Sequence, residues 1–183
     1  VVHAMADGEW GGTQFKVGSV KKNTNGTSNP LLNFAYGGFQ QARGATLAQR
    51  NRFYMEGSLE MLDAPSEWHF EPASRELYLF PPAGVALSAD TKLVLTQTDT
   101  LFEFVGESSD AGSRVEHIVF ANLSFGHTSA QFFRPHEETS GGDYATHRSG
   151  AIKIENATGL TFSGNDFSHV GGNAVVLSAS VRN

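Results

Sequence analysis

The 183-residue chain contains no cysteine. Disulfides, thiolate metal sites and cysteine nucleophiles are therefore excluded, while the redox compartment stays open. Long apolar runs are also missing, and a membrane-spanning helix needs about 18 or more apolar residues in succession, so we expect no membrane span. Positive charge is scarce: 13 Lys and Arg stand against 19 Asp and Glu, for a net charge of −6. This charge balance disfavours a nucleic-acid partner, because proteins that bind nucleic acid usually present a stripe of basic residues.

Short sequence segments recur in the second half of the chain. Residues 151–154 (Ala-Ile-Lys-Ile) match residues 174–177 (Ala-Val-Val-Leu), 23 positions later. Residues 117–127 match residues 159–169, 42 positions later. Residues 102–104 (Phe-Glu-Phe) take the place of 152–154, 50 positions earlier. The shortest offset is one period of 23 residues, and the two longer offsets are the same period lengthened by loops inserted at particular corners. A fixed period interrupted by loops is typical of solenoids.

The repeats predict an all-β fold, a parallel β-helix with coils of about 23 residues that occupies residues 99–183. Residues 1–98 predict an irregular β-rich part with a β-hairpin at about 67–80. Further expectations for that part are strands at 1–5, 13–17, 31–36 and 92–96, a short helix at 46–52, and burial of Trp68 and Tyr78. The chain stops in mid-circuit without a visible cap, which indicates a fragment with further coils or subunits at its open C-terminal end.

An insertion between two coils, residues 128–149, gathers ionisable side chains. Glycoside hydrolysis needs two carboxylates, and outward residues of neighbouring coils lie about 4.8 Å apart. Asp143, which follows two glycines, is the first catalytic candidate, with Glu155 and Asp166 as partners. The substrate-binding candidates are polar or cationic residues of the same region: His136, His147, Arg148 and His169.

Other interpretations of these residues stay open. A solvated acidic loop explains the insertion without catalysis, and the repeat offset stacks His127 on His169 as corner residues that bond to the backbone. His136, Glu137, Asp143 and His147 could hold Ca²⁺ or a transition-metal ion, although they match no known ligand spacing. Three sequons make Asn25, Asn122 and Asn156 possible glycosylation sites.

Four stretches carry a resemblance to a known family: residues 41–44, residues 53–68 (ending Glu-Met-Leu-Asp-Ala-Pro-Ser-Glu-Trp), residues 77–82 (Leu-Tyr-Leu-Phe-Pro-Pro), and the glycine motifs from 141 to 175. With them the chain resembles secreted right-handed parallel β-helix proteins of the pectin-lyase-like superfamily, in the group related to β-helix glycoside hydrolases. The resemblance implies the right-handed fold, secretion and carbohydrate chemistry. Related sequences often carry an acidic residue where this chain has Gly171, which weakens the transfer of activity.

Two functions follow as expectations. The first is an extracellular carbohydrate-active protein that binds or hydrolyses a polysaccharide with outward carboxylates, a glycoside hydrolase-like enzyme if it is active. The second is a non-catalytic structural or adhesive protein of the cell surface, in which the β-helix is a stiff rod.

Overall fold

The computed structural model describes residues 1–5, 11–22, 29–40, 52–107, 112–138 and 145–178. Regular structure in these ranges consists of β-strands and one 3₁₀ turn, η2 (Leu59–Met61), so the predicted all-β class is confirmed. The chain divides into two compact units, unit 1 (Val1–Gly38 with Gly44–Leu93) and unit 2 (Phe39–Arg43 with Val94–Asn183). None of the described segments forms a helix long and apolar enough to cross a membrane.

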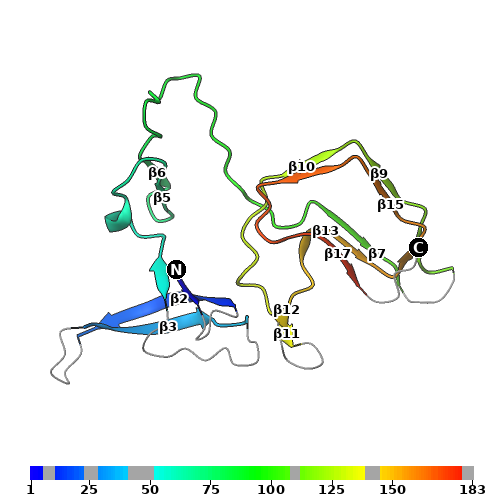
Figure 1. Cartoon of the computed structure of the whole chain (residues 1–183), viewed down its shortest axis with the longest axis horizontal. Coiled ribbons are helices and arrows are strands. Elements are labelled where there is room, and N and C mark those ends of the chain that lie inside the picture. Colours follow the sequence, from blue (N-terminus) through cyan, green and yellow to red (C-terminus); the bar gives the residue numbers. More distant parts are fainter. Residues whose placement is uncertain (6–10, 23–28, 41–51, 108–111, 139–144, 179–183) are drawn as a thin grey trace. The chain divides into compact units, whose positions relative to one another are not determined.

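Unit 1 contains a four-stranded antiparallel sheet (Figure 1). Its order is β3 (Leu31–Gly37), β2 (Gly12–Lys21), β1 (Val2–Met5) and β4 (Phe53–Met55). The three strands predicted before residue 37 are confirmed. Val2 and Ala4 are buried on the central strand β1, as expected for alternate residues of a strand that covers a core on one face.

The predicted hairpin of unit 1 is confirmed. Strand β5 (Trp68–Glu71) pairs antiparallel with β6 (Glu76–Leu79) across the turn at 72–75. The predicted burial of Trp68 is wrong, since its side chain is 64% exposed, while Tyr78 is half-buried. In this register Trp68 lies opposite Leu79, and a side chain on a two-stranded sheet is buried only where another layer packs on its face.

The strand predicted at 92–96 is also wrong, because no strand forms there. Leu93, Val94 and Leu95 are all more than half exposed. Their β-propensity finds no neighbouring strand among the described residues, and a strand is stable only when its backbone groups bond to a partner. The short helix predicted at 46–52 falls almost wholly on residues outside the described ranges.

Unit 2 is built from parallel strand pairs, each joining two segments of the repeat (Figure 1). The first set of strands is β7 (Phe102–Val105), β8 (Val115–Glu116), β9 (Val119–Ala121) and β10 (Ser124–Gly126). The second set is β13 (Gly150–Glu155), β14 (Ala157–Thr158), β15 (Thr161–Ser163) and β16 (Asp166–Ser168), followed by β17 (Asn173–Ser178). The sheets are β17-β13-β7, β14-β8, β15-β9 and β10-β16.

The register of these pairs is the one that the repeats predict. Phe120 pairs with Phe162 and Phe125 with Phe167, at the offset of 42. Ile154 of β13 lies between its two predicted partners, Phe104 of β7 and Leu177 of β17. The stacked ring pairs have centroids 4.9 and 4.8 Å apart, close to the usual spacing of neighbouring strands.

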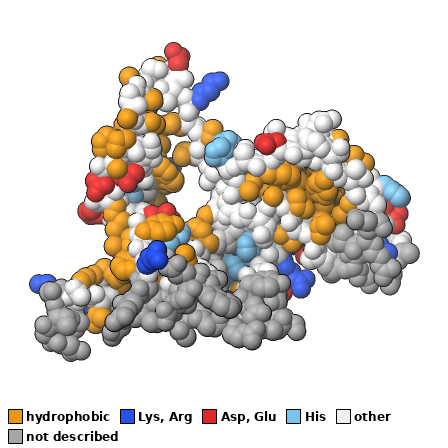
Figure 2. Space-filling model, in the orientation of Figure 1, with side chains coloured by type: hydrophobic (Ala, Val, Ile, Leu, Met, Phe, Trp, Pro, Cys, Tyr) orange, Lys and Arg blue, Asp and Glu red, His pale blue; other side chains and the backbone are white. Residues whose placement is uncertain are grey.

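The core of unit 2 forms around β13. Ile152, Ile154 and Ala157 are fully buried, and Phe120 and Phe125 are 4% and 5% exposed. Phe102 and Phe162 are 43% and 36% exposed on either side of this core. Figure 2 shows hydrophobic side chains at the surface in the area that β10, β15 and β13 surround in Figure 1. Burial is therefore deepest at β13 and Ala157 of the second set and at Phe120 and Phe125 of the first.

Corners between the strands adopt the left-handed backbone conformation at matching positions. The pairs, each 42 residues apart, are His117 with Gly159, Asn122 with Gly164, and His127 with His169, with φ values between 54° and 67°. Non-glycine residues rarely adopt this conformation, and Asn, Asp and His are enriched among those that do. The short polar residues of the repeat are therefore turn formers.

Candidate functional site

The insertion predicted to carry the site forms a two-stranded antiparallel ribbon between β10 and β13. Strand β11 (Glu137–Glu138) pairs with β12 (Ala145–Thr146). The first catalytic candidate, Asp143, belongs to the connection between these strands and lies outside the described residues. The site is therefore built from the side chains at the base of the ribbon.

Four side chains lie at this base in two pairs, His136 with His147 and Glu137 with Arg148, and we call them the ribbon cluster. The two imidazole rings lie edge to face with centroids 4.8 Å apart. Arg148 Nε donates to Glu137 Oε2 at 3.1 Å, between two side chains that are each more than half exposed. An exposed ion pair of this kind adds little stability, so its groups can exchange partners with a ligand. The structure brings two of the four predicted substrate-binding residues, His136 and His147, into contact and places a third, Arg148, beside them in the chain.

Hydrogen bonds fix the orientation of both imidazoles. His136 Nδ1 lies 2.7 Å from the backbone oxygen of Arg134, and a carbonyl only accepts, so this nitrogen carries a proton. His147 Nδ1 lies 2.6 Å from Ser149 Oγ. Asn173 Nδ2 at the start of β17 donates to the backbone oxygens of Ser149 and His147 at 3.0 and 3.4 Å. Each ring is thus held by one nitrogen, which leaves the other nitrogen to contact a ligand.

Partial burial lowers the pKa of His147 below its ordinary value of 6.5, and the neighbouring His136 lowers it further. The folded chain therefore prefers the neutral imidazole more strongly than the unfolded chain does. The folded chain therefore keeps its full stability above the pKa that His147 has in the unfolded chain. As the pH falls from that value through the lower pKa of His147 in the folded chain, stability declines. The cluster consequently keeps a neutral ring, which can both donate to and accept from a hydroxyl group.

A His147→Gln variant tests this pH dependence. We expect the urea midpoint of the wild type to fall between about pH 7.5 and pH 5 by more than that of the variant, since glutamine has no proton to gain. The matched control is His169→Asn, which removes an imidazole elsewhere in unit 2. An equal decline in wild type and His147→Gln would contradict the assignment.

The catalytic candidate Glu155 is engaged by neighbouring side chains. Lys153 Nζ lies 2.8 Å from Glu103 Oε1 and 3.5 Å from Glu155 Oε1, and Ser178 Oγ donates to the same Glu155 oxygen at 3.0 Å. The hydrogen bond to Glu103 raises the pKa of Lys153 most, against partial burial, and the charge of Glu155 raises it further. The side chain of Glu155 is 22% exposed. This geometry is that of a carboxylate holding strands β13 and β17 together.

Asp166 and His169 lie on the strand pair β10-β16 and its following corner. Asp166 begins β16, opposite Ser124, and its backbone N–H donates to the Leu123 oxygen at 2.9 Å. The predicted stacking of His169 on His127 is confirmed, with ring centroids 5.1 Å apart and planes 12° apart. These residues belong to a different sheet from Glu155 and are not part of the ribbon cluster.

Gly171, the position where the resemblance suggests an acidic residue, has no room for a side chain. A β-carbon there would lie 2.1 Å from the backbone oxygen of Ser129 and 2.3 Å from its carbonyl carbon. Two hydrogen bonds hold the chains at this approach, from Gly171 N to Thr128 Oγ1 at 2.8 Å and from Gln131 N to Gly171 O at 2.9 Å. Gly171 therefore fastens the corner after β16 to the start of the insertion.

Two of the three sequon asparagines are described. Asn156 Nδ2, the atom to which a glycan would be joined, donates to Gly106 O at 3.0 Å. Asn122 is exposed at a left-handed corner. Asn25 lies outside the described ranges. Within those ranges, no group of three or more His, Cys, Asp or Glu is placed to hold a metal ion. The Ca²⁺ and glycosylation expectations stay predictions.

Sequence reasoning missed the partners of Glu155. The offset of 23 that aligns Ile154 with Leu177 also places Ser178 opposite Glu155, so this contact could have been found from the register. Lys153 lies two residues earlier on the same strand, and side chains two residues apart share a face of a strand.

Comparisons of the chain with protein-family models, curated proteins and solved structures find no match in any of the three.

Proposed function

We propose that unit 2 is a right-handed parallel β-helix and that the protein is an extracellular glycan-binding protein, which holds a polysaccharide at the ribbon cluster. The fold proposal is supported by five parallel strand pairs in the register of the repeats. Parallel crossover connections are almost always right-handed, which favours that hand here.

The observation that carries the binding proposal is the ribbon cluster itself. His136 and His147 each have one ring nitrogen held by the chain, so the other can meet a sugar hydroxyl in a defined direction. Arg148 adds donors from an exposed guanidinium. Imidazole rings and a guanidinium together offer the mixture of donors and acceptors that a polyhydroxylated chain requires.

Binding is favoured over hydrolysis by the state of the carboxylates. Glu155 is engaged by Lys153 and Ser178, and Gly171 leaves no space for an acidic side chain. Hydrolysis would need Asp143 together with a second carboxylate at the separation that acid and base catalysis demands. The structural or adhesive role is the second candidate, and the same two observations favour it.

Affinity electrophoresis of the full chain through gels that contain plant, algal or microbial polysaccharides tests the proposal. We expect retardation by at least one polysaccharide, and at least a tenfold weaker effect for His136→Gln and Arg148→Gln, the range for losing one to two hydrogen bonds at about 1.4 kcal/mol per tenfold. His169→Asn is the matched control, since asparagine tolerates its left-handed backbone.

Two results would overturn the site. Retardation lost in His169→Asn but kept in His136→Gln would move the site to the stacked corner. No retardation by any polysaccharide, with the protein folded, would favour the structural role. Release of reducing ends that disappears in an Asp143→Asn variant would add hydrolysis to binding.

A further inference from the structure

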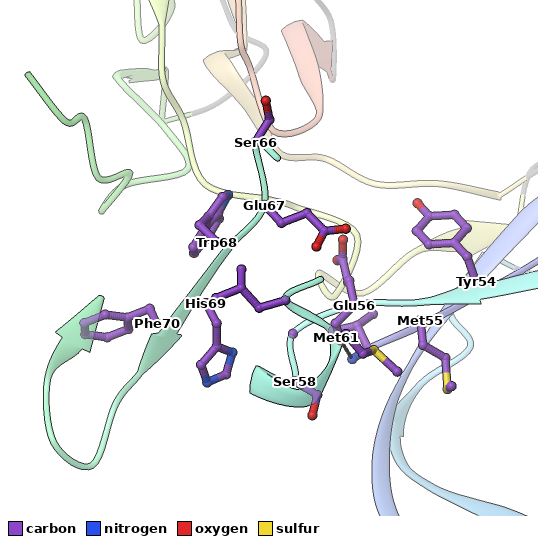
Figure 3. A pocket seen from close by; sticks show the side chains of 13 residues that line it. Tyr54, Met55, Glu56, Ser58, Met61, Ser66, Glu67, Trp68, His69 and Phe70 are labelled. Carbon is purple, nitrogen blue, oxygen red and sulfur yellow. Dashed lines mark hydrogen bonds between the residues drawn. The ribbon is translucent and has the colours of Figure 1, made fainter. Parts of the chain in front are cut away.

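Unit 1 contains an open hollow that the ribbon cluster does not explain. Its volume is about 640 Å³, within the range of small-molecule sites. The lining comes from β4, the segment around η2, and β5 (Figure 3). In the view of Figure 3, Trp68 and Phe70 lie on one side, Tyr54 and Met55 on the other, and the carboxyl groups of Glu56 and Glu67 between them.

The two carboxylates are held in place by the protein. Glu67 Oε2 accepts from the backbone N–H groups of Asp63 and Ala64 at 2.8 and 2.9 Å. Glu56 Oε1 lies 2.7 Å from His3 Nε2, and the side chain of His3 is only 12% exposed. Each interaction uses one oxygen of its carboxylate, so the second oxygen of each can meet a ligand without moving the side chain.

The walls of the hollow offer flat apolar surfaces. Trp68 is 64% exposed although it stands on a strand beside its hairpin partner. Tyr54 is 60% exposed, and its ring is fixed by stacking on His3 with centroids 4.4 Å apart and planes 3° apart. Rigid exposed aromatic rings are suited to stacking against the C–H face of a sugar or to contact with a cation.

The charge of the lining selects the ligand. Glu56 and Glu67 line the hollow together with the N-terminal ammonium of Val1, which is engaged by the Glu56 backbone oxygen at 2.7 Å, and the lining residues include no Lys or Arg side chain. An anionic sugar would be repelled by this pair, whereas an ammonium group would be attracted by both carboxylates and by the aromatic faces. A ligand that combines a flat apolar face with an amine satisfies the aromatic and the acidic parts of the lining together.

We infer that this hollow binds an amino sugar, with the pyranose ring stacked on Trp68 and the ammonium group beside Glu56 and Glu67. The volume accommodates a short oligomer. The site lies in unit 1, does not involve the ribbon cluster in unit 2, and is independent of the function proposed there.

Fluorescence titration with glucosamine oligomers, and with their N-acetylated counterparts, tests the inference. The two probes share the ring and differ in the charge on nitrogen. The chain has two tryptophans, so a Trp10→Phe variant leaves Trp68 as the single indole. We expect a saturable change in its emission with the glucosamine oligomer, and at least tenfold weaker binding of the acetylated one.

Variants at the hollow separate its two contributions. Glu56→Gln should weaken binding of the glucosamine oligomer about tenfold or more while leaving any weak binding of the acetylated oligomer unchanged. Trp68→Ala, followed by calorimetry in place of fluorescence, should abolish binding of both. The controls are Asp90→Asn, an exposed carboxylate outside the lining, and His136→Gln in the ribbon cluster, and neither should alter the affinity.

Three outcomes with the single-tryptophan protein would overturn the inference: equal affinity for both oligomers, no binding of either, or binding of a lysine-rich peptide without binding of the glucosamine oligomer. The third would assign the hollow to a basic protein segment. Loss of binding in His136→Gln would also contradict it, by placing the amino-sugar site in the ribbon cluster, so failure here and failure of the function proposed for unit 2 are distinguishable.

Discussion

Replacing Gly171 with alanine should destabilise the protein by about 3 kcal/mol or more, at the upper end of what overpacking costs. The new β-carbon would lie 2.1 Å from Ser129 O and 2.6 Å from Ala130 N, both backbone atoms that no rotamer change can move away. The chain can relieve the collision only by separating the corner after β16 from the insertion. Urea unfolding followed by far-UV circular dichroism measures the loss.

Gly11→Ala is the control for this substitution. No atom lies within 4 Å of a β-carbon at Gly11, so we expect a change of no more than about 1 kcal/mol. Similar midpoints for the wild type and the Gly171→Ala variant would show that the two segments are not in contact. Gly171→Asp should be at least as damaging as alanine, which means that a carboxylate cannot be added to this corner by a single substitution.

Replacing Ile154 with alanine should cost about 3–4 kcal/mol of unfolding free energy, the usual range for a fully buried isoleucine. Ile154 is 0% exposed at the centre of unit 2. Its register partner Leu177 on β17 is 49% exposed, so Leu177→Ala should cost about 1 kcal/mol or less. Ile154 and Leu177 are paired on neighbouring parallel strands and differ mainly in exposure. The comparison of the two variants therefore tests the effect of burial.

Chemical denaturation of both variants, with unit 2 followed by hydrogen exchange of the β13 amides, measures the difference. A large loss in both variants would show that β17 is covered as well as β13 is. A small loss in both would contradict the core described around Ile152 and Ile154.

The register of unit 2 was predictable because the same residue types recur in the sequence at a fixed offset. Phenylalanine recurs at 120 and 162 and at 125 and 167, and a row of like side chains on neighbouring parallel strands forces one alignment. The corners were predictable in the same way, since His127 and His169 repeat both a residue type and a left-handed backbone.

The exposure of Trp68 and the loss of a strand at 92–96 could not be predicted from local pattern. The hairpin arm alternates as strands do, and residues 92–96 form a short apolar run of strand-forming residues. In both cases the outcome depends on which neighbour covers the segment, which the sequence alone does not reveal. The role of Glu155 was predictable only in part, since the register places Ser178 opposite it without showing that the two side chains bond. An outward carboxylate on a strand is equally consistent with catalysis and with a bond to Ser178, and only the side-chain geometry distinguishes them.

The ribbon cluster was predictable as a group of residues but not as an arrangement. The sequence placed His136, His147 and Arg148 in one insertion, while the antiparallel pairing of Glu137 with Thr146 is what brings the two imidazoles within 4.8 Å. The register of a short hairpin depends on its turn and on which residues pair, and the residue types at 128–149 do not indicate this register.

Cosedimentation of the full chain with a panel of insoluble polysaccharides, compared between wild type and a His136→Gln, Arg148→Gln double variant, is the most direct test of the glycan site. We expect at least one polysaccharide to remove the wild type from solution and to leave most of the double variant behind. Equal sedimentation of both proteins, or none of either while both are folded, would contradict a glycan site at the ribbon cluster.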